Sequence, residues 1–285
     1  MESLGSKRLI ATASGRYAVW SRGDGPLVVL LHGWPVSSYH FRHLMPALDA
    51  SGFEAIAIDL NGLGESSAAG DDFRKESLAR DIWQLFGELV PDHGGVSLVG
   101  HDWGGSIAIA MAALERGRVR RLVVEDEIPP GIEAPLRGEG SKRYPTWHGG
   151  LHRTVGLAED LIRGKEERYL SFFLDLRASA ASLPADLRQH YIDLHRSEEK
   201  TRVALAYYRF YQADSDFFRR LQAAKLDIPV LAAYGAYGMG PAVLDSLRTI
   251  ASSVSDISFD QSGHYPAEEE PEAFNAAVSA FLRGQ

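Results

Sequence analysis

Six short apolar runs, each ending close to a glycine or an acidic residue, constrain the fold of this chain most. They lie at residues 27–31, 55–58, 96–99, 122–124, 228–233 and 257–259. Their shortness and β-branched content are typical of strands that are buried on both faces of a parallel sheet. Apolar residues at helical spacing lie between them, at 41–48, 78–89, 106–114, 243–250 and 273–282. This alternation predicts an α/β fold with a mostly parallel central sheet flanked by helices.

One long interval without a strand pattern interrupts this alternation. Residues 128–131 read Ile-Pro-Pro-Gly, which ends the preceding strand. Helical patterns then follow at 157–163, 166–173, 185–195 and 201–211. We therefore expect a core of residues 1–130 and 216–285 with a helical cap, residues 131–215, inserted into it. At the carboxyl edge of the sheet, such a cap would cover whatever binds there.

Composition and charge exclude several classes of function. The 285 residues include no cysteine, which excludes disulfides, thiolate metal sites and a thiol nucleophile. The net charge of −8 argues against nucleic acid or an anionic membrane as a partner. The N-terminus lacks the apolar stretch of a signal peptide, and the longest apolar run, 107–114, is far shorter than the about 20 residues of a membrane span. We expect a cytoplasmic protein.

The segment Gly100-His101-Asp102-Trp103-Gly104-Gly105 follows a predicted strand and opens a predicted helix. This is the setting of a nucleophile elbow, a sharp turn that exposes its central side chain above the sheet. The central residue is Asp102, and a carboxylate can attack carbon to form an ester. The helix N-terminus favours its ionised form. The alternative is that Asp102 is only a helix N-cap, for which aspartate is a favoured residue.

Two further segments favour the catalytic interpretation. His32-Gly33-Trp34-Pro35 follows an earlier strand, where such folds place a loop that supplies an oxyanion-hole N–H. Trp34 and Trp103 would then provide backbone donors. His264 lies between the last strand and the last helix, from where it can reach the same edge of the sheet. The alternatives are a simple turn at Pro35 and a surface histidine at 264.

Three consecutive acids, Glu125-Asp126-Glu127, end the strand after the elbow. One of them could hold His264 in the tautomer that a general base needs. We expect the other two to be solvated at the strand end. Neighbours on a strand point to opposite faces, so the pattern alone leaves all three acids open as the partner.

With these residues, the chain resembles the α/β-hydrolase fold enzymes that use an aspartate nucleophile: epoxide hydrolases, haloalkane dehalogenases and fluoroacetate dehalogenases. The matching blocks are His32–Pro35, Asp59–Ser66, Gly100–Gly105 and Gly263-His264. The resemblance implies Asp126 as the acid, because the other family position, the loop 234–239, contains no carboxylate. Glu125 and Glu127 remain alternatives.

The resemblance also bears on the reaction. Haloalkane dehalogenases usually have asparagine where this chain has Trp34, and fluoroacetate dehalogenases have arginine where it has Trp103. Tyr208 matches the cap tyrosine with which epoxide hydrolases hold the epoxide oxygen. His148 matches the second donor of a His/Tyr subgroup, although two glycines follow it where aromatic residues are expected. Without the resemblance, these aromatic residues would be interpreted as cap packing.

The resemblance therefore implies an epoxide hydrolase that opens an epoxide to a vicinal diol. Asp102 would form a covalent alkyl-enzyme ester, and water activated by His264 would hydrolyse it. The small epoxide would be the only partner apart from a possible second copy in a homodimer, and no metal or organic cofactor is needed. A haloalkane dehalogenase with the same Asp102, His264 and acid, and a non-catalytic ligand-binding protein of this fold, are the alternatives.

Overall fold

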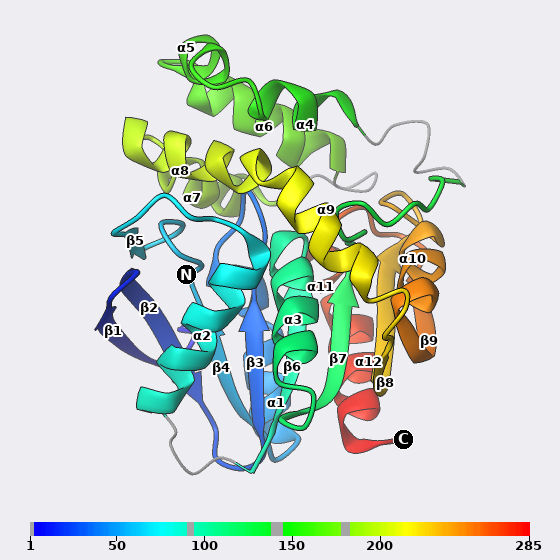
Figure 1. The fold of residues 1–285 in the computed structure, drawn as a ribbon. Coiled ribbons are helices and arrows are strands. Elements are labelled where there is room, and N and C mark those ends of the chain that lie inside the picture. The colour runs from blue at the N-terminus through cyan, green and yellow to red at the C-terminus, as the bar shows by residue number, and fades with distance from the viewer. Residues whose placement is uncertain (1–2, 90–93, 138–144, 178–182) are drawn as a thin grey trace.

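The central feature of the computed structural model, which describes residues 3–89, 94–137, 145–177 and 183–285, is one mostly parallel sheet (Figure 1). Its strands follow the order β1-β2-β4-β3-β6-β7-β8-β9, with β5 beside β2. They are β1 (Ser6–Thr12), β2 (Gly15–Arg22), β3 (Leu27–Leu31), β4 (Glu54–Ile58), β5 (Ser67–Ala68), β6 (Val96–His101), β7 (Val119–Glu125), β8 (Leu226–Gly235) and β9 (Ala251–Phe259).

The parallel part of the sheet, from β4 to β9, contains all six predicted strands. Every residue of β3 and β6 is buried, as expected of central strands with helices on both faces. This arrangement confirms the predicted α/β fold. β1 and β2 form an antiparallel extension that we did not predict. β1 is mostly exposed, so its sequence shows no apolar run.

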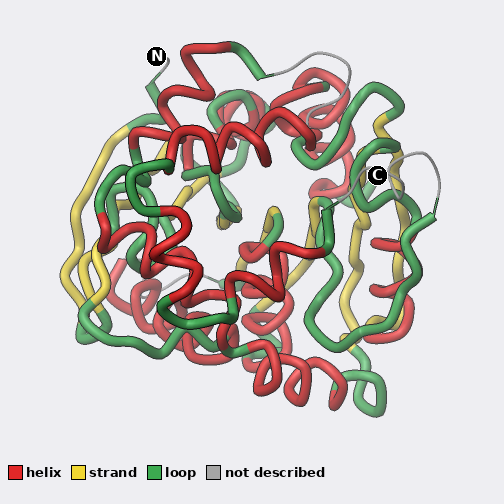
Figure 2. Tube along the Cα trace, turned by 90° about the horizontal axis from the view of Figure 1, so that it is seen from above, coloured by secondary structure: helices red, strands yellow, loops and turns green. Residues whose placement is uncertain are grey.

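Helices cover both faces of the sheet, and the view from above shows them on either side of the strands (Figure 2). One buried apolar cluster joins the sheet to α2, α3 and α10, and a second joins it to α1 and α12. The helices outside the insertion are η1 (Ser38–Phe41), α1 (Leu44–Ala50), α2 (Lys75–Leu89), α3 (Trp103–Leu114), α10 (Ala242–Ile250), α11 (Pro266–Glu269) and α12 (Pro271–Arg283).

A helical insertion between β7 and β8 lies above the edge at which the parallel strands end (Figure 1). It contains α4 (Trp147–His152), α5 (Leu157–Ile162), α6 (Glu166–Arg177), α7 (Ala185–Asp193), α8 (Glu198–Arg209) and α9 (Tyr211–Arg220). The sequence did not predict α4 or α9. α9 runs across residue 215, where we expect the cap to end, and the division into core and cap stays a prediction. Over the described ranges, no helix is long and apolar enough to cross a membrane.

The last strand is longer than its apolar run. β9 begins at Ala251, six residues before the predicted start at Ile257. It is the edge strand of the sheet, and most of its residues between Ala251 and Phe259 are not buried. An edge strand faces solvent on more sides than a central one, so its first half lacks the apolar pattern by which strands were predicted.

Candidate active site

The turn that carries Asp102 lies between β6 and α3, at the carboxyl edge of the sheet. Asp102 has φ 49° and ψ −127°, a strained conformation for a residue with a side chain. Its side chain makes no capping hydrogen bond to α3, so the helix-cap interpretation does not account for it. Instead, its Oδ1 accepts a hydrogen bond from the Trp34 N–H at 2.9 Å. The turn therefore holds the carboxylate away from its own helix.

Two glycines make room for this turn. A Cβ atom on Gly33 would lie 2.2 Å from the Cβ of Asp102, and one on Gly104 would lie 2.0 Å from the carbonyl oxygen of Leu31. Both distances are far below van der Waals contact, so any larger residue would displace Asp102 or the strand beside it. The glycines of these two motifs are thus required by close approach of the backbone.

The structure brings His264 and Asp126 to the same edge as Asp102. His264 Nδ1 lies 2.7 Å from Asp126 Oδ2, and His264 Nε2 lies 3.5 Å from Asp102 Oδ2. Asp126, fully buried, also accepts hydrogen bonds from the Met239 N–H, at 3.0 and 3.1 Å. The loop 234–239, which contains no carboxylate, thus donates a backbone hydrogen bond to Asp126, which directly follows β7. The three groups can act as an acid, a base and a nucleophile in series.

The two neighbouring acids are not solvated, and that expectation was wrong. Glu125 is buried and accepts from the Ala267 N–H at 2.8 Å, while its other oxygen lies 3.0 Å from His40 Nε2. Glu127 is buried and accepts from the Ser106 hydroxyl. β7 is a central strand, so the elements packed around its end exclude water and provide each acid with its own donor.

The buried ion pairs of His40 predict a pH-dependent stability. Burial lowers the pKa of His40, but the carboxylates of Glu125 and Glu268 outweigh burial and raise the pKa to about 9. The folded pKa lies above the ordinary 6.5. The stabilisation is therefore fully present below pH 6.5 and is lost as the pH rises through 9, a change on the order of 3 kcal/mol. Denaturant unfolding at several pH values measures this change in the free energy of unfolding. His40→Gln is expected to flatten this decline, and an equal decline in both proteins would contradict the assignment.

Asp102 lines a cavity of about 400 Å³. Its wall includes His148 of α4 and Tyr208 of α8, and their ring centroids lie 5.7 Å apart. The Tyr208 ring also packs edge-on against Trp34, at 6.1 Å, and against Trp103, at 4.8 Å. The two predicted donors of the cap therefore share one cavity with the predicted nucleophile.

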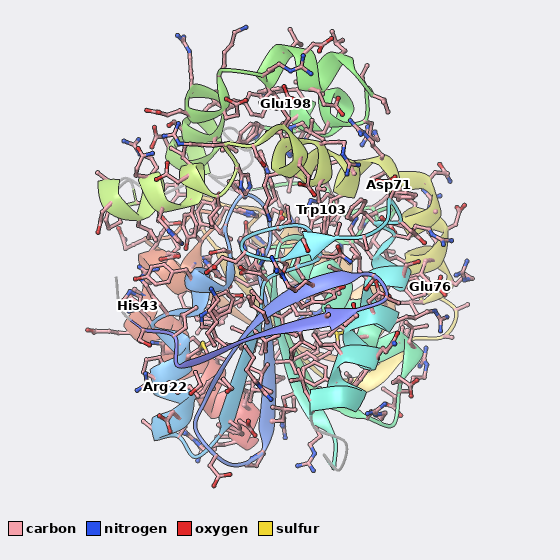
Figure 3. All side chains as sticks on the ribbon, turned by 90° about the vertical axis from the view of Figure 1, so that its left-hand side faces the viewer. Arg22, His43, Asp71, Glu76, Trp103 and Glu198 are labelled. Atoms are coloured by element: carbon pink, nitrogen blue, oxygen red, sulfur yellow. The ribbon has the colours of Figure 1, made fainter. Side chains whose placement is uncertain are left out.

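Trp34 and Trp103, the predicted oxyanion-hole residues, flank Asp102 from two elements. Trp34 directs its N–H at the carboxylate, whereas Trp103 is the first residue of α3. Figure 3 labels Trp103 between the sheet and the helical insertion that carries Glu198. A backbone N–H in the first turn of a helix has no partner within that helix, so it is available to a developing negative charge.

Sequence reasoning missed His152, a second histidine beside Tyr208. Its ring centroid lies 4.4 Å from that of Tyr208, and its Nε2 lies 2.6 Å from the hydroxyl of Tyr169. His148 and His152 are four residues apart on α4, so they share one face of the helix. That spacing is the signal that could have identified it. His152 is fully buried, and its ring packs against the rings of His148 and Tyr208. Within the described part of the chain, no cluster of three or more potential ligands could hold a metal ion.

Comparisons with known proteins identify the family to which this chain belongs. Residues 26–271 match the family described as alpha/beta hydrolase fold. The chain is 32% identical to the soluble epoxide hydrolase of Corynebacterium sp. (strain C12), over 88% of this chain and 87% of that protein. It is 29% identical to epoxide hydrolase A of Mycobacterium tuberculosis (strain ATCC 25618 / H37Rv), over 98% of both chains.

Solved structures give the same result. Wild-type Cfl2 from Burkholderia cenocepacia superposes with a TM-score of 0.87 at 31% identity, covering 96% of this chain and 95% of that one. The epoxide hydrolase CorEH superposes with a TM-score of 0.88 at 28% identity, covering 98% and 99%. The chain therefore belongs to the α/β-hydrolase fold and, within it, to the epoxide hydrolase family.

Proposed function

We propose that this protein is an epoxide hydrolase that converts an epoxide to a vicinal diol through an ester on Asp102. One observation carries the proposal. Asp102 is aligned with His264 and Asp126 at the sheet edge, and it shares a cavity with Tyr208 and His148 of the insertion. A nucleophile on one side of a cavity and hydrogen-bond donors on the other suit a reaction that breaks a carbon–oxygen bond between them.

In the first step, a carboxylate oxygen of Asp102 attacks one ring carbon from the side opposite the epoxide oxygen. A carbon–oxygen bond forms to Asp102 as the ring carbon–oxygen bond breaks, and the electron pair moves to the epoxide oxygen. Tyr208 and His148 donate hydrogen bonds to this oxygen, and one of them transfers the proton that makes it a hydroxyl. The oxygen never leaves the substrate, which is why the donors belong on the cavity wall.

In the second step, His264 takes a proton from a water molecule, and the resulting hydroxide attacks the ester carbonyl of Asp102. The backbone N–H groups of Trp34 and Trp103 stabilise the tetrahedral oxyanion. As the intermediate collapses, the ester carbon–oxygen bond breaks, and the departing alkoxide takes the proton from His264 to become the second hydroxyl of the diol. The proton left on Asp102 returns to the donor that lost one in the first step, which restores the Asp102 carboxylate. Asp126 keeps His264 oriented and stabilises the imidazolium until its proton returns.

The same nucleophile and base would also serve a haloalkane dehalogenase. The pairing of Tyr208 with His148 favours the epoxide, because the oxygen of an opening epoxide ring must gain a proton, whereas a departing halide needs none. A non-catalytic binding protein would keep the cavity but would not need the 2.7 Å contact between His264 and Asp126.

A substrate panel tests the proposal. Styrene-type, aliphatic and terpene epoxides are offered beside chloroalkanes, and diols and free halide are measured by chromatography and by halide titration. We expect diols from at least one epoxide class and no halide. Halide without diol would identify a dehalogenase, and no product from any compound would favour a binding protein.

Tyr208→Phe tests the ring-opening donor. Removal of the hydroxyl takes away acid assistance while the aromatic packing remains, so we expect kcat/KM for epoxides to fall roughly 10²-fold. Tyr237→Phe, a change at a partly exposed tyrosine, is the matched control and should leave kcat/KM unchanged. Wild-type kinetics in Tyr208→Phe would exclude this tyrosine as a donor.

A further inference from the structure

The cavity above Asp102 holds a second carboxyl group, that of Glu127, to which the proposed reaction gives no role. Glu127 follows Asp126 directly and lines the same cavity as Asp102 and Met239. Only 4% of its surface is exposed. A buried carboxyl group is costly unless it is hydrogen-bonded, so its place in the lining of a substrate cavity needs an explanation of its own.

The surroundings of Glu127 hold it firmly beside the nucleophile. Ser106, in the first turn of α3, donates its hydroxyl hydrogen to Glu127 Oε1. A Cβ atom on Gly105 would lie 3.1 Å from the Cβ of Glu127, so the side chain packs closely against the start of α3. The helix that begins at the nucleophile therefore fixes the position of Glu127 as well.

Lys75, a buried cation, forms its ion pair with Asp214 rather than with Glu127. Lys75 Nζ lies 3.1 Å from Asp214 Oδ2, donates to the Tyr207 carbonyl oxygen at 2.6 Å and lies 4.1 Å from the centre of the Trp103 ring. Among the described residues, no ion pair is formed by Glu127 itself. Its charge is thus not neutralised by a partner in contact with it.

The setting of this carboxyl group favours its protonated form. Burial, together with the nearby charge of Asp102, raises the pKa of Glu127 well above its ordinary value, and Ser106 and Lys75 only partly oppose this. A protonated carboxyl has an O–H to donate, which an ionised one lacks. Ser106 donates to Oε1, so the hydrogen of the protonated form would be carried by the other oxygen.

We propose that Glu127 is a specificity-determining residue that donates a hydrogen bond to an oxygen-bearing substituent beside the epoxide ring. The inference rests on the proposed function and adds a substrate class to it: epoxides that carry a hydroxyl, ether or carbonyl oxygen next to the ring. An epoxide with only hydrocarbon substituents would offer no acceptor to the acid hydrogen of Glu127, and such a mismatch is what lets a polar site discriminate.

Two probes that differ by a single hydroxyl group test this inference. They are trans-3-phenylglycidol and trans-β-methylstyrene oxide, in which a methyl group replaces the hydroxymethyl group. The measured quantity is the ratio of their kcat/KM values for the wild type, Glu127→Gln and Glu127→Met. Gln keeps a donor and an acceptor at this position, whereas Met has a similar size and no donor. Because both probes meet the same enzyme sample, the ratio does not depend on how much of a variant is folded.

We expect the wild type to prefer the hydroxylated probe about tenfold, the effect of one hydrogen bond in a closed site. Glu127→Gln should keep most of this preference, and Glu127→Met should lose it. Hydrolysis of both probes with the same ratio in all three proteins would overturn the role of Glu127 and leave the proposed function standing. Hydrolysis of neither probe by the wild type, together with failure of the epoxide panel, would overturn both.

Discussion

Asp102→Ala is expected to abolish epoxide turnover, with kcat falling roughly 10⁴- to 10⁶-fold, as when the nucleophile of a covalent mechanism is removed. The Asp102 carboxylate is the group placed between the Trp34 N–H and His264, and alanine has no atom that could form the ester. Initial-rate measurements with saturating epoxide give the loss directly.

The control for this variant separates chemistry from folding. Alanine has the same Cβ as aspartate and keeps the backbone strain at φ 49° nearly unchanged, so we expect the thermal midpoint of Asp102→Ala to stay close to that of the wild type. Asp260→Ala removes an exposed acid and should leave turnover unchanged. If a folded Asp102→Ala protein turned over within tenfold of the wild type, another group would have to be the nucleophile.

His264→Gln is expected to separate the two steps. Ring opening by Asp102 needs no histidine base, so one equivalent of epoxide should be consumed quickly. Hydrolysis of the ester should then slow by roughly 10²- to 10⁴-fold, because water loses its general base. Rapid quenching followed by mass spectrometry should find the enzyme heavier by one epoxide molecule, with the added mass on the peptide that contains Asp102.

A second histidine provides the matched control for this experiment. Figure 3 shows His43 away from Trp103 and the candidate site, so we expect His43→Gln to keep wild-type turnover. A His264→Gln protein that hydrolysed epoxides at the wild-type rate, or that lost ring opening together with hydrolysis, would show that His264 does not act in the second step alone.

The sequence could predict the parallel strands and the positions of Asp102, His264 and Asp126 for one physical reason. Each of these residues directly follows a strand or lies in the loop after one, and the carboxyl ends of parallel strands meet at one edge. Local motifs and sheet topology were therefore enough to predict that these side chains meet. In the structure, the ring nitrogens of His264 lie 2.7 Å from a carboxylate oxygen of Asp126 and 3.5 Å from one of Asp102.

What the sequence could not predict depends on packing between distant elements. Glu125 is buried because His40 and the N–H of Ala267 reach it from separate parts of the chain. Glu127 is buried because the start of α3 packs against it and Ser106 donates a hydrogen bond to it. His152 is recognisable only once α4 is known to be a helix that faces Tyr208. Patterns within one segment carry no information about such contacts.

A single turnover in ¹⁸O-labelled water tests the central claim, the ester on Asp102, most directly. Wild-type enzyme in excess over epoxide limits each active site to one reaction. If Asp102 forms the ester and water attacks its carbonyl carbon, the first diol carries no ¹⁸O and the label appears in the carboxylate of Asp102. A first-turnover diol that contains ¹⁸O, with an unlabelled Asp102, would contradict the account, because water would then have attacked the epoxide itself.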